Sequence, residues 1–173
     1  MKRIVILALL VTGLMAAEGQ DYFGLNAGRA ELRATSDANH AKVDDTHYSL
    51  TLGHYYNDNG RISATYSYVD ADSVVDTSDA LTVAYDFILP VANDKVFLYA
   101  GPLVGYTRYE EPGLDLSGFH YGAEAGVIVP VIENIEVEAG YRYAIETGSD
   151  TIAGISIDAD DLRMWYVGAN LRF

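Results

Sequence analysis

Apolar and polar side chains alternate with a period of two residues through most of the chain after residue 20. This period is typical of β-strands whose two faces meet different environments, whereas a helix needs a period near 3.6. Eight segments carry the pattern, centred on residues 22–28, 48–53, 61–68, 81–87, 96–106, 119–129, 135–143 and 165–173. The alternation predicts an all-β fold of eight antiparallel strands, and a length of 173 residues favours a single domain.

Segment 96–106 departs from the alternation because both of its faces are apolar. It contains Pro102, which has no N–H to donate to a neighbouring strand. We expect a local β-bulge at Pro102 that lets the sheet continue.

The connections between the segments are alternately short and long. The short ones lie at 57–60, 90–94 and 130–134, and the long ones at 31–45, 69–79, 108–117 and 144–161. An up-and-down transmembrane β-barrel has short turns at one end and long loops at the other. The lengths therefore predict such a barrel, with both termini at the short-turn end.

The chemistry of the two faces separates a membrane barrel from a soluble barrel of the lipocalin type, which has the same strand count. One face collects bulky aliphatic and aromatic residues, and the other collects Gly, Ser, Thr and compact charged groups that are too small to fill a core. We expect the apolar face to meet lipid. Tyrosines near strand ends suit a membrane–water boundary. They are Tyr22, Tyr55, Tyr56, Tyr66, Tyr68, Tyr106, Tyr141 and Tyr143.

Residues 1–17 predict an export signal. Lys2 and Arg3 precede the apolar run 4–14, and Ala16 and Ala17 are small residues suited to a signal peptidase. We expect cleavage near Ala17, which leaves 18–173 as the barrel domain. No later segment is apolar over the roughly 18 residues that a transmembrane helix requires.

The charge balance is strongly acidic, with 25 Asp+Glu against 11 Lys+Arg and a net charge of -14. This balance argues against nucleic acid as a partner. The absence of cysteine excludes a disulfide scaffold and any thiolate metal site. Sixteen of the acids fall in the four long connections. Among them Asp158, Asp160 and Asp161 offer oxygen ligands to calcium, although their spacing matches no EF-hand loop and a solvated acidic surface explains them as well.

Three stretches resemble the outer-membrane β-barrel family of Gram-negative bacteria, in particular the OmpA-barrel, OmpX and opacity-protein class. They are 22–28, which is similar to a first strand of that family, 138–143, which is similar to its penultimate strand, and the closing strand 165–173. The resemblance covers nearly all of 18–173 and implies a location in the outer membrane, beside lipid and lipopolysaccharide. It also implies that the closing strand is a signal for the barrel-assembly machinery. The signal residues are Trp165, Val167, Ala169, Leu171 and Phe173.

Strand parity points a set of charged side chains into the barrel, whose interior is just wide enough for side chains when there are eight strands. The set is Arg61, Asp86, His120, Glu124, Glu136, Glu138, Arg142 and Arg172. If the turn near Val131 is symmetric, Glu124 lies opposite Glu138 and His120 lies opposite Arg142. Two facing carboxylates need an arginine between them or a shared proton. Such a network is either a salt-bridged plug, which we favour, or a gated ion path.

We also considered enzymes that modify lipid. His47 and Ser49 share one strand face, as a base and its nucleophile must, but no acidic third member accompanies them. The four histidines do not form a metal set, and no cofactor is expected. We expect a structural or surface-interaction protein that displays four acidic extracellular loops to an unknown host or surface ligand. The alternative is a narrow porin-like conduit, and a lipid-modifying enzyme is the third possibility.

Overall fold

The computed structural model describes residues 19–36, 39–70, 77–93, 95–110, 117–152 and 155–173. Regular secondary structure in these ranges consists of β-strands. The described residues include no helix that is long and apolar enough to cross a bilayer.

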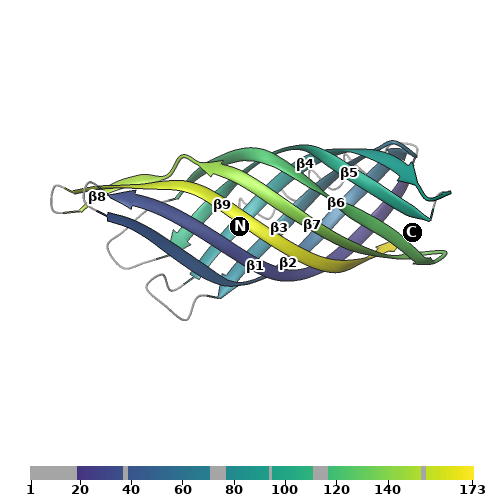
Figure 1. The fold of residues 1–173 in the computed structure, drawn as a ribbon, viewed down its shortest axis with the longest axis horizontal. Helices are drawn as coiled ribbons and strands as arrows, with labels where there is room; N and C mark the ends of the chain where they lie inside the picture. Colours follow the sequence, from purple (N-terminus) through teal and green to yellow (C-terminus); the bar gives the residue numbers. More distant parts are fainter. Residues whose placement is uncertain (1–18, 37–38, 71–76, 94, 111–116, 153–154) are drawn as a thin grey trace, which may run out of the picture.

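Apart from one short strand near the end of the chain, consecutive strands pair side by side in an antiparallel meander, and the first strand pairs with the last (Figure 1). The strands are β1 (Gln20–Ser36), β2 (Asn39–Asn57), β3 (Gly60–Asp70), β4 (Thr77–Val91), β5 (Val96–Glu110), β6 (Gly118–Ile132), β7 (Ile135–Glu146), β8 (Ser149–Ile152) and β9 (Ile155–Arg172). The short β8 pairs only with the beginning of β9. The other eight strands form a closed barrel, which confirms the predicted fold class.

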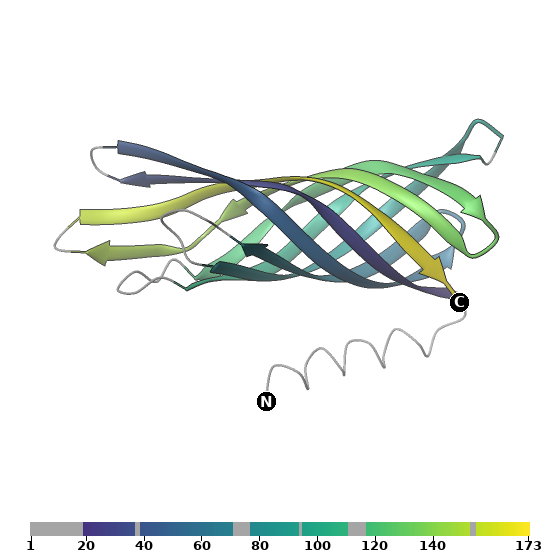
Figure 2. The same cartoon turned by 90° about the horizontal axis from the view of Figure 1, so that it is seen from below.

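The seam between β1 and β9 closes the barrel. Its register runs from Tyr22↔Arg172 to Ser36↔Ile157, with one shift between Arg33 and Ala34. At the short-turn end the backbone N–H of Phe173 donates to the carbonyl of Asp21 at 2.9 Å. Figure 2 shows the C-terminus at this end of the barrel, away from the β1–β2 and β8–β9 hairpins.

Two of the expected long loops are mostly strand, which corrects the sequence-based boundaries. The β1–β2 ladder continues to Ser36↔Asn39, so most of 31–45 belongs to a hairpin. Most of 144–161 likewise belongs to β7, β8 and β9. Backbone groups go on pairing beyond the bilayer, where both faces of a strand meet water and apolar alternation is no longer required.

The two faces of the barrel are inverted relative to a soluble protein. Large apolar side chains remain exposed on the outside, and the two most exposed aromatic ones, Phe119 and Trp165, reach 65%. Buried side chains include arginines, carboxylates and histidines. Lipid is the environment that suits such an exterior.

Pro102 lies in β5 without the expected bulge. The β4–β5 register is the same on either side of it, at Ala84↔Leu103 and at Phe87↔Ala100. On the other side of β5, Pro102 pairs with Ala123. Its missing N–H removes a hydrogen bond from the ladder without adding a residue to the strand.

Candidate functional site: the charged barrel interior

Arg61 of β3 lies at the centre of a charged layer in the short-turn half of the barrel. Its Nε donates to Asp86 at 2.8 Å, and its two terminal nitrogens donate to the carboxylate of Glu138 at 2.8 and 3.0 Å. The guanidinium carbon lies 4.4 Å from the centre of the Tyr99 ring and 5.5 Å from that of Tyr22. Both carboxylates are thus paired with a single cation that is itself only 2% exposed.

Glu136 forms a second layer nearer the short-turn end. It accepts hydrogen bonds from the Tyr55 hydroxyl at 2.5 Å and from the Asn170 amide at 3.2 Å, and Arg172 lies 3.7 Å away. Asn170 also donates to Glu138 at 2.8 Å and so connects the two layers. Below them a cavity of about 610 Å³ lies at the short-turn end of the barrel.

Arg142 and Glu124 form a third layer towards the long-hairpin end. They are direct cross-strand partners, and their N···O distances are 2.7 and 2.6 Å. The guanidinium of Arg142 lies 5.3 Å from the centre of the Tyr166 ring. Each buried arginine is therefore matched by a carboxylate and an aromatic face.

His120 lies above this layer in a small hydrogen-bond network. Its two ring nitrogens lie 3.0 Å from the Thr82 hydroxyl and 2.9 Å from that of Thr107. Thr107 is 3.0 Å from Glu146, which is also buried. Glu146 belongs to the barrel interior, not to an acidic loop.

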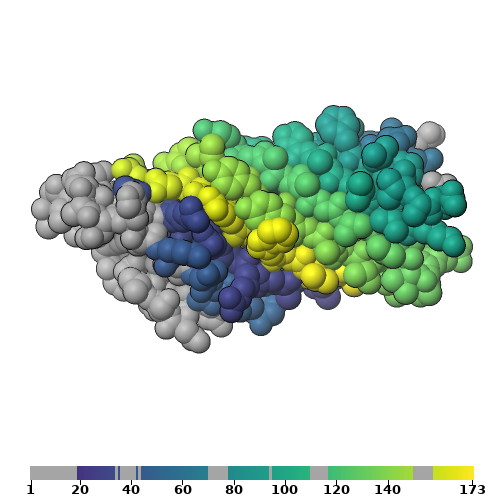
Figure 3. All heavy atoms as spheres, in the orientation of Figure 1, coloured from purple at the N-terminus to yellow at the C-terminus, as the bar shows by residue number. Residues whose placement is uncertain are grey.

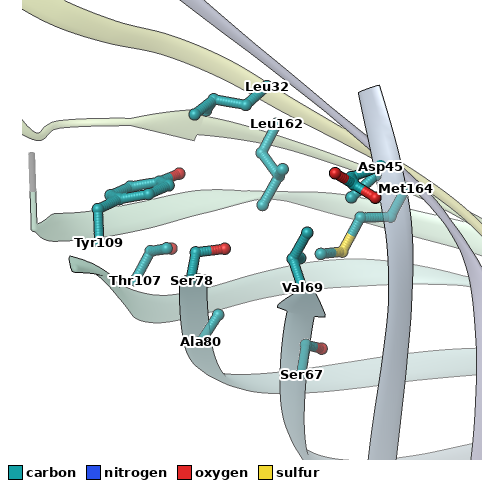
Figure 4. Close-up of a pocket in the computed structure, with 11 residues that line it drawn as sticks. Leu32, Asp45, Ser67, Val69, Ser78, Ala80, Thr107, Tyr109, Leu162 and Met164 are labelled. Carbon is teal, nitrogen blue, oxygen red and sulfur yellow. The ribbon is translucent and has the colours of Figure 1, made fainter. Parts of the chain in front are cut away.

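The interior becomes apolar at the long-hairpin end. A cluster around Leu162 and Met164 includes Leu32 and Val69. Figure 4 shows these four side chains around a common space, together with Tyr109. The cavity among them is about 30 Å³, which is room for roughly one water molecule.

Glycines in the strands make room for the interior tyrosines. The hydroxyls of Tyr99 and Tyr166 are 2.6 Å apart. A Cβ at Gly140 would meet both rings, and a Cβ at Gly126 would meet Tyr99. The glycine-rich inner face is therefore the complement of the aromatic side chains that cross the interior.

Comparisons with known proteins decide the family. The family model described as "Outer membrane protein beta-barrel domain" matches residues 4–173. The chain belongs to this family.

Solved barrels share the fold at low sequence identity. Neisserial surface protein A is 20% identical, with 87% of this chain and 97% of that chain covered and a TM-score of 0.67. Outer membrane protein H (OprH) of P. aeruginosa is 20% identical, with 89% and 99% covered and a TM-score of 0.62. OprG of Pseudomonas aeruginosa is 14% identical, with 91% and 98% covered and a TM-score of 0.59. No curated protein matches the sequence.

Family membership and the inverted barrel establish the cell outer membrane as the location of this protein. In such barrels the short turns face the periplasm and the long connections face the exterior. The closing-strand residues of this outer-membrane barrel lie on the outer, lipid-facing side of β9 or at its end. They are Trp165, Val167, Ala169, Leu171 and Phe173. The expected cleavage site near Ala17 lies outside the described residues.

The eight charged residues expected in the interior are all buried or half-buried there, but two of the expected pairings are wrong. Glu124 lies opposite Arg142, not Glu138, and Glu138 lies opposite Ile128. His120 lies opposite Glu146, not Arg142. The β6–β7 turn is formed by residues 133–134, next to a register shift between Pro130 and Ile132, so it is not centred on Val131.

Sequence reasoning missed the aromatic part of the interior. It put Tyr22 and Tyr55 at the membrane boundary, but Tyr22 is 1% exposed and Tyr55 donates to Glu136 inside the barrel. Their parity was available as a signal, because Tyr22 alternates with Phe23 and Leu25. A position near a strand end therefore does not by itself place a tyrosine at the lipid boundary, because parity decides which face its side chain joins.

The three aspartates considered for calcium lie at the beginning of β9. Asp160 accepts a hydrogen bond from the Thr35 hydroxyl, and Asp161 pairs with Arg163 at 2.7 Å. In the part of the chain that the structure describes, no group of three His, Cys, Asp or Glu residues could hold a metal ion.

His47 and Ser49 are both buried on the inner face of β2, as parity predicted. No hydrogen bond joins their side chains among the described residues, and Nδ1 of His47 has no partner there. Side chains on this face point away from the bilayer lipids that a lipid-modifying enzyme would have to reach.

Proposed function

We propose that this outer-membrane barrel has a structural or surface-interaction role and catalyses no reaction. The observation that carries the proposal is the packed interior, where charged layers centred on Arg61 and Arg142 lie one above the other. In this role the barrel is an anchor, and the hairpins beyond the membrane are the parts that meet a partner.

The energetics of the charged layers support a closed barrel. An ion that crossed the interior would have to separate Arg61 from Glu138 or Arg142 from Glu124, and each separation leaves an uncompensated buried charge. The apolar cluster around Leu162 is a further barrier at the exterior end. These features favour the salt-bridged plug over the gated ion path.

The acidic surface supports a cationic partner outside the cell. Exposed acids of the described hairpins include Asp44, Asp158 and Asp160, and the whole chain carries a net charge of -14. Such a surface attracts cations and positively charged partners over about 8 Å at physiological ionic strength. We propose a host or surface ligand of this charge type and the barrel-assembly machinery as partners.

One observation favours the second candidate, a narrow conduit. The cavity of about 610 Å³ at the periplasmic end is lined by Glu136 and Arg172, so it extends up to the Glu136 layer, below Arg61. Rearrangement of the layers above it would be needed for conduction.

Single-channel recording in planar bilayers tests the proposal. We expect no conductance steps from the refolded protein. The matched variant Arg61→Ala with Asp86→Ala and Glu138→Ala removes one charged layer and tests whether that layer is the barrier. Reproducible steps from the wild-type protein would overturn the closed-barrel function and support the conduit.

A further inference from the structure

Basic side chains on the outside of the barrel gather on one side of it. Of the nine Arg and Lys residues after position 18, Arg61, Arg142 and Arg172 face the interior. Four others lie together on β1, β2 and β9 near the exterior boundary of the apolar belt. We call these four the seam patch, and they are Arg29, Arg33, Lys42 and Arg163.

The register of the seam brings these four residues together. Arg33 is the cross-strand partner of Lys42, and Glu31 is the partner of Arg163. Directly opposed residues have Cβ atoms about 5 Å apart, and the next pair on the same face is about 7 Å away. The seam patch is therefore small enough to meet a single anionic head group.

Acidic neighbours neutralise part of the patch, but none of those that the structure describes pairs with Arg29. Glu31 lies 2.8 Å from Arg33 and 2.9 Å from Lys42, and Asp161 lies 2.7 Å from Arg163. The exposed guanidinium of Arg29 has no ion-pair partner among the described residues. An unpaired arginine at a membrane boundary favours a phosphate, which it can bind through two parallel hydrogen bonds.

An apolar groove begins at Arg29 and crosses the lipid-facing surface from β1 over β9, β7 and β6 to β5. Its open volume is about 730 Å³. Small residues such as Ala27, Ala125 and Ala139 form part of its lining, and Trp165 and Tyr141 also line it. The two aromatic rings pack with their centres 4.4 Å apart. The face that carries β1 and β9 is turned to the viewer in Figure 3.

The seam patch and the apolar groove meet at the same level along the barrel axis. On β1 the outward side chains change from Phe23, Leu25 and Ala27 to Arg29, and Arg29 is the cross-strand partner of Trp165. Tryptophan is enriched at membrane–water boundaries. Because β1 rises from the periplasmic end, the seam patch lies at the level of the outer leaflet.

We propose that the seam patch and the groove bind the lipid A part of lipopolysaccharide. A phosphate binds Arg29 with help from Arg163, and an acyl chain lies in the groove between Ala139 and Trp165. The basic side chains complement the charge of a phosphate, and the patch lies at the level of the outer leaflet. Both observations favour a phosphorylated lipid of that leaflet as the ligand. The site is independent of whether the barrel conducts, so the failure of either proposal leaves the other standing.

Native mass spectrometry of the refolded barrel in detergent, with purified bisphosphorylated lipid A as the probe, tests the site. Loss of an arginine–phosphate contact worth about 1.5 kcal/mol lowers affinity roughly tenfold, which is the effect we expect for Arg29→Gln. Ala139→Leu fills the groove and should also weaken retention. The matched controls are Arg108→Gln, which removes a basic residue on the far strand β5, and Ala169→Leu, which enlarges a lipid-facing residue outside the groove.

Three outcomes would overturn the proposal. The first is unchanged lipid A retention in both Arg29→Gln and Ala139→Leu. The second is an equal loss in the two controls, since the effect would then not belong to this site. The third is equal retention of dephosphorylated lipid A or of phosphatidylglycerol by the wild-type protein. Heat-modifiable gel migration verifies that each variant has folded before it is compared.

Discussion

Arg61 compensates two buried carboxylates at once, and this makes it the residue whose loss should matter most to stability. Asp86 is 0% exposed and Glu138 is 5% exposed, so neither carboxylate gains much hydration when its partner is removed. A buried ion pair adds little net stability over apolar packing, but breaking it on one side is costly. The cost arises because Asp86 and Glu138 stay buried after Arg61 is removed, and no cation is left to offset their lost hydration.

We predict that Arg61→Met lowers the free energy of unfolding by about 3–5 kcal/mol. The matched control is Arg108→Met, because Arg108 pairs with Asp79 on the half-exposed surface at 2.7 Å and such pairs contribute about 0–1 kcal/mol. Urea unfolding of the refolded proteins in detergent or liposomes measures both. Equal losses in the two variants would contradict the assigned role of Arg61.

The cations of the seam patch also differ in how free they are to bind an anionic ligand. Hydrogen bonds from Lys42 and Arg33 hold the pKa of Glu31 below its usual value, so this carboxylate is ionised at neutral pH. It forms ion pairs with both cations. Arg29 has no such partner among the described residues. At neutral pH it is therefore the most available cation of the patch for an anionic ligand.

At the level of the strand, glycines on the inner faces of β6 and β7 leave room for aromatic rings from β5 and β9. Gly140 of β7 lies beneath Tyr99 of β5 and Tyr166 of β9, which meet across the interior. The three residues come from three strands, so their fit couples the positions of those strands. A larger side chain at position 140 would collide with the rings of Tyr99 and Tyr166.

We predict that Gly140→Val destabilises the barrel by about 1–3 kcal/mol, because the new methyl groups displace the two tyrosines from their hydrogen bond. Ala169→Val adds two methyl groups on the lipid side of β9 and should stay within roughly 0.5 kcal/mol of the wild type. The same urea titration measures both variants. A cost at position 169 as large as that at position 140 would contradict the account.

The sequence was informative about strand faces and poor at strand register. A period of two decides which side chains share a face, and it identified Arg61, Glu124, Glu138 and Arg142 as inward-facing. It does not decide which residues stand opposite each other, because register depends on the turn. Because the turn lies at residues 133–134 and the register shifts beside Pro130, Glu138 does not face Glu124 as expected. The ends of the strands were also missed, since periodicity fades where the barrel leaves the bilayer.

At the scale of the whole molecule, closure places the C-terminal residue beside the first strand. The N–H of Phe173 donates to Asp21, and Phe173 is 61% exposed. Its ring is therefore not part of the packed interior.

We predict that Phe173→Ala reduces the amount of barrel in the outer membrane several-fold in cells and leaves the stability of the refolded protein nearly unchanged. This prediction rests on the proposed partnership with the assembly machinery, which would read the closing strand before the barrel forms. Comparing the heat-modifiable band in outer-membrane fractions with urea unfolding in vitro separates the two effects. Parallel losses in cells and in vitro would assign Phe173 to stability instead.

The seam between β1 and β9 also has a thermodynamic consequence. Arg29 and Trp165 are direct neighbours in space, yet they belong to the two ends of the barrel sequence. A lipid that binds across them binds only the completed ring, and by mass action a ligand of the native state alone stabilises that state. The free energy of unfolding of the closed barrel would then depend on the lipid composition of the outer leaflet. The resistance of this protein to unfolding would be determined by its membrane as well as by its sequence.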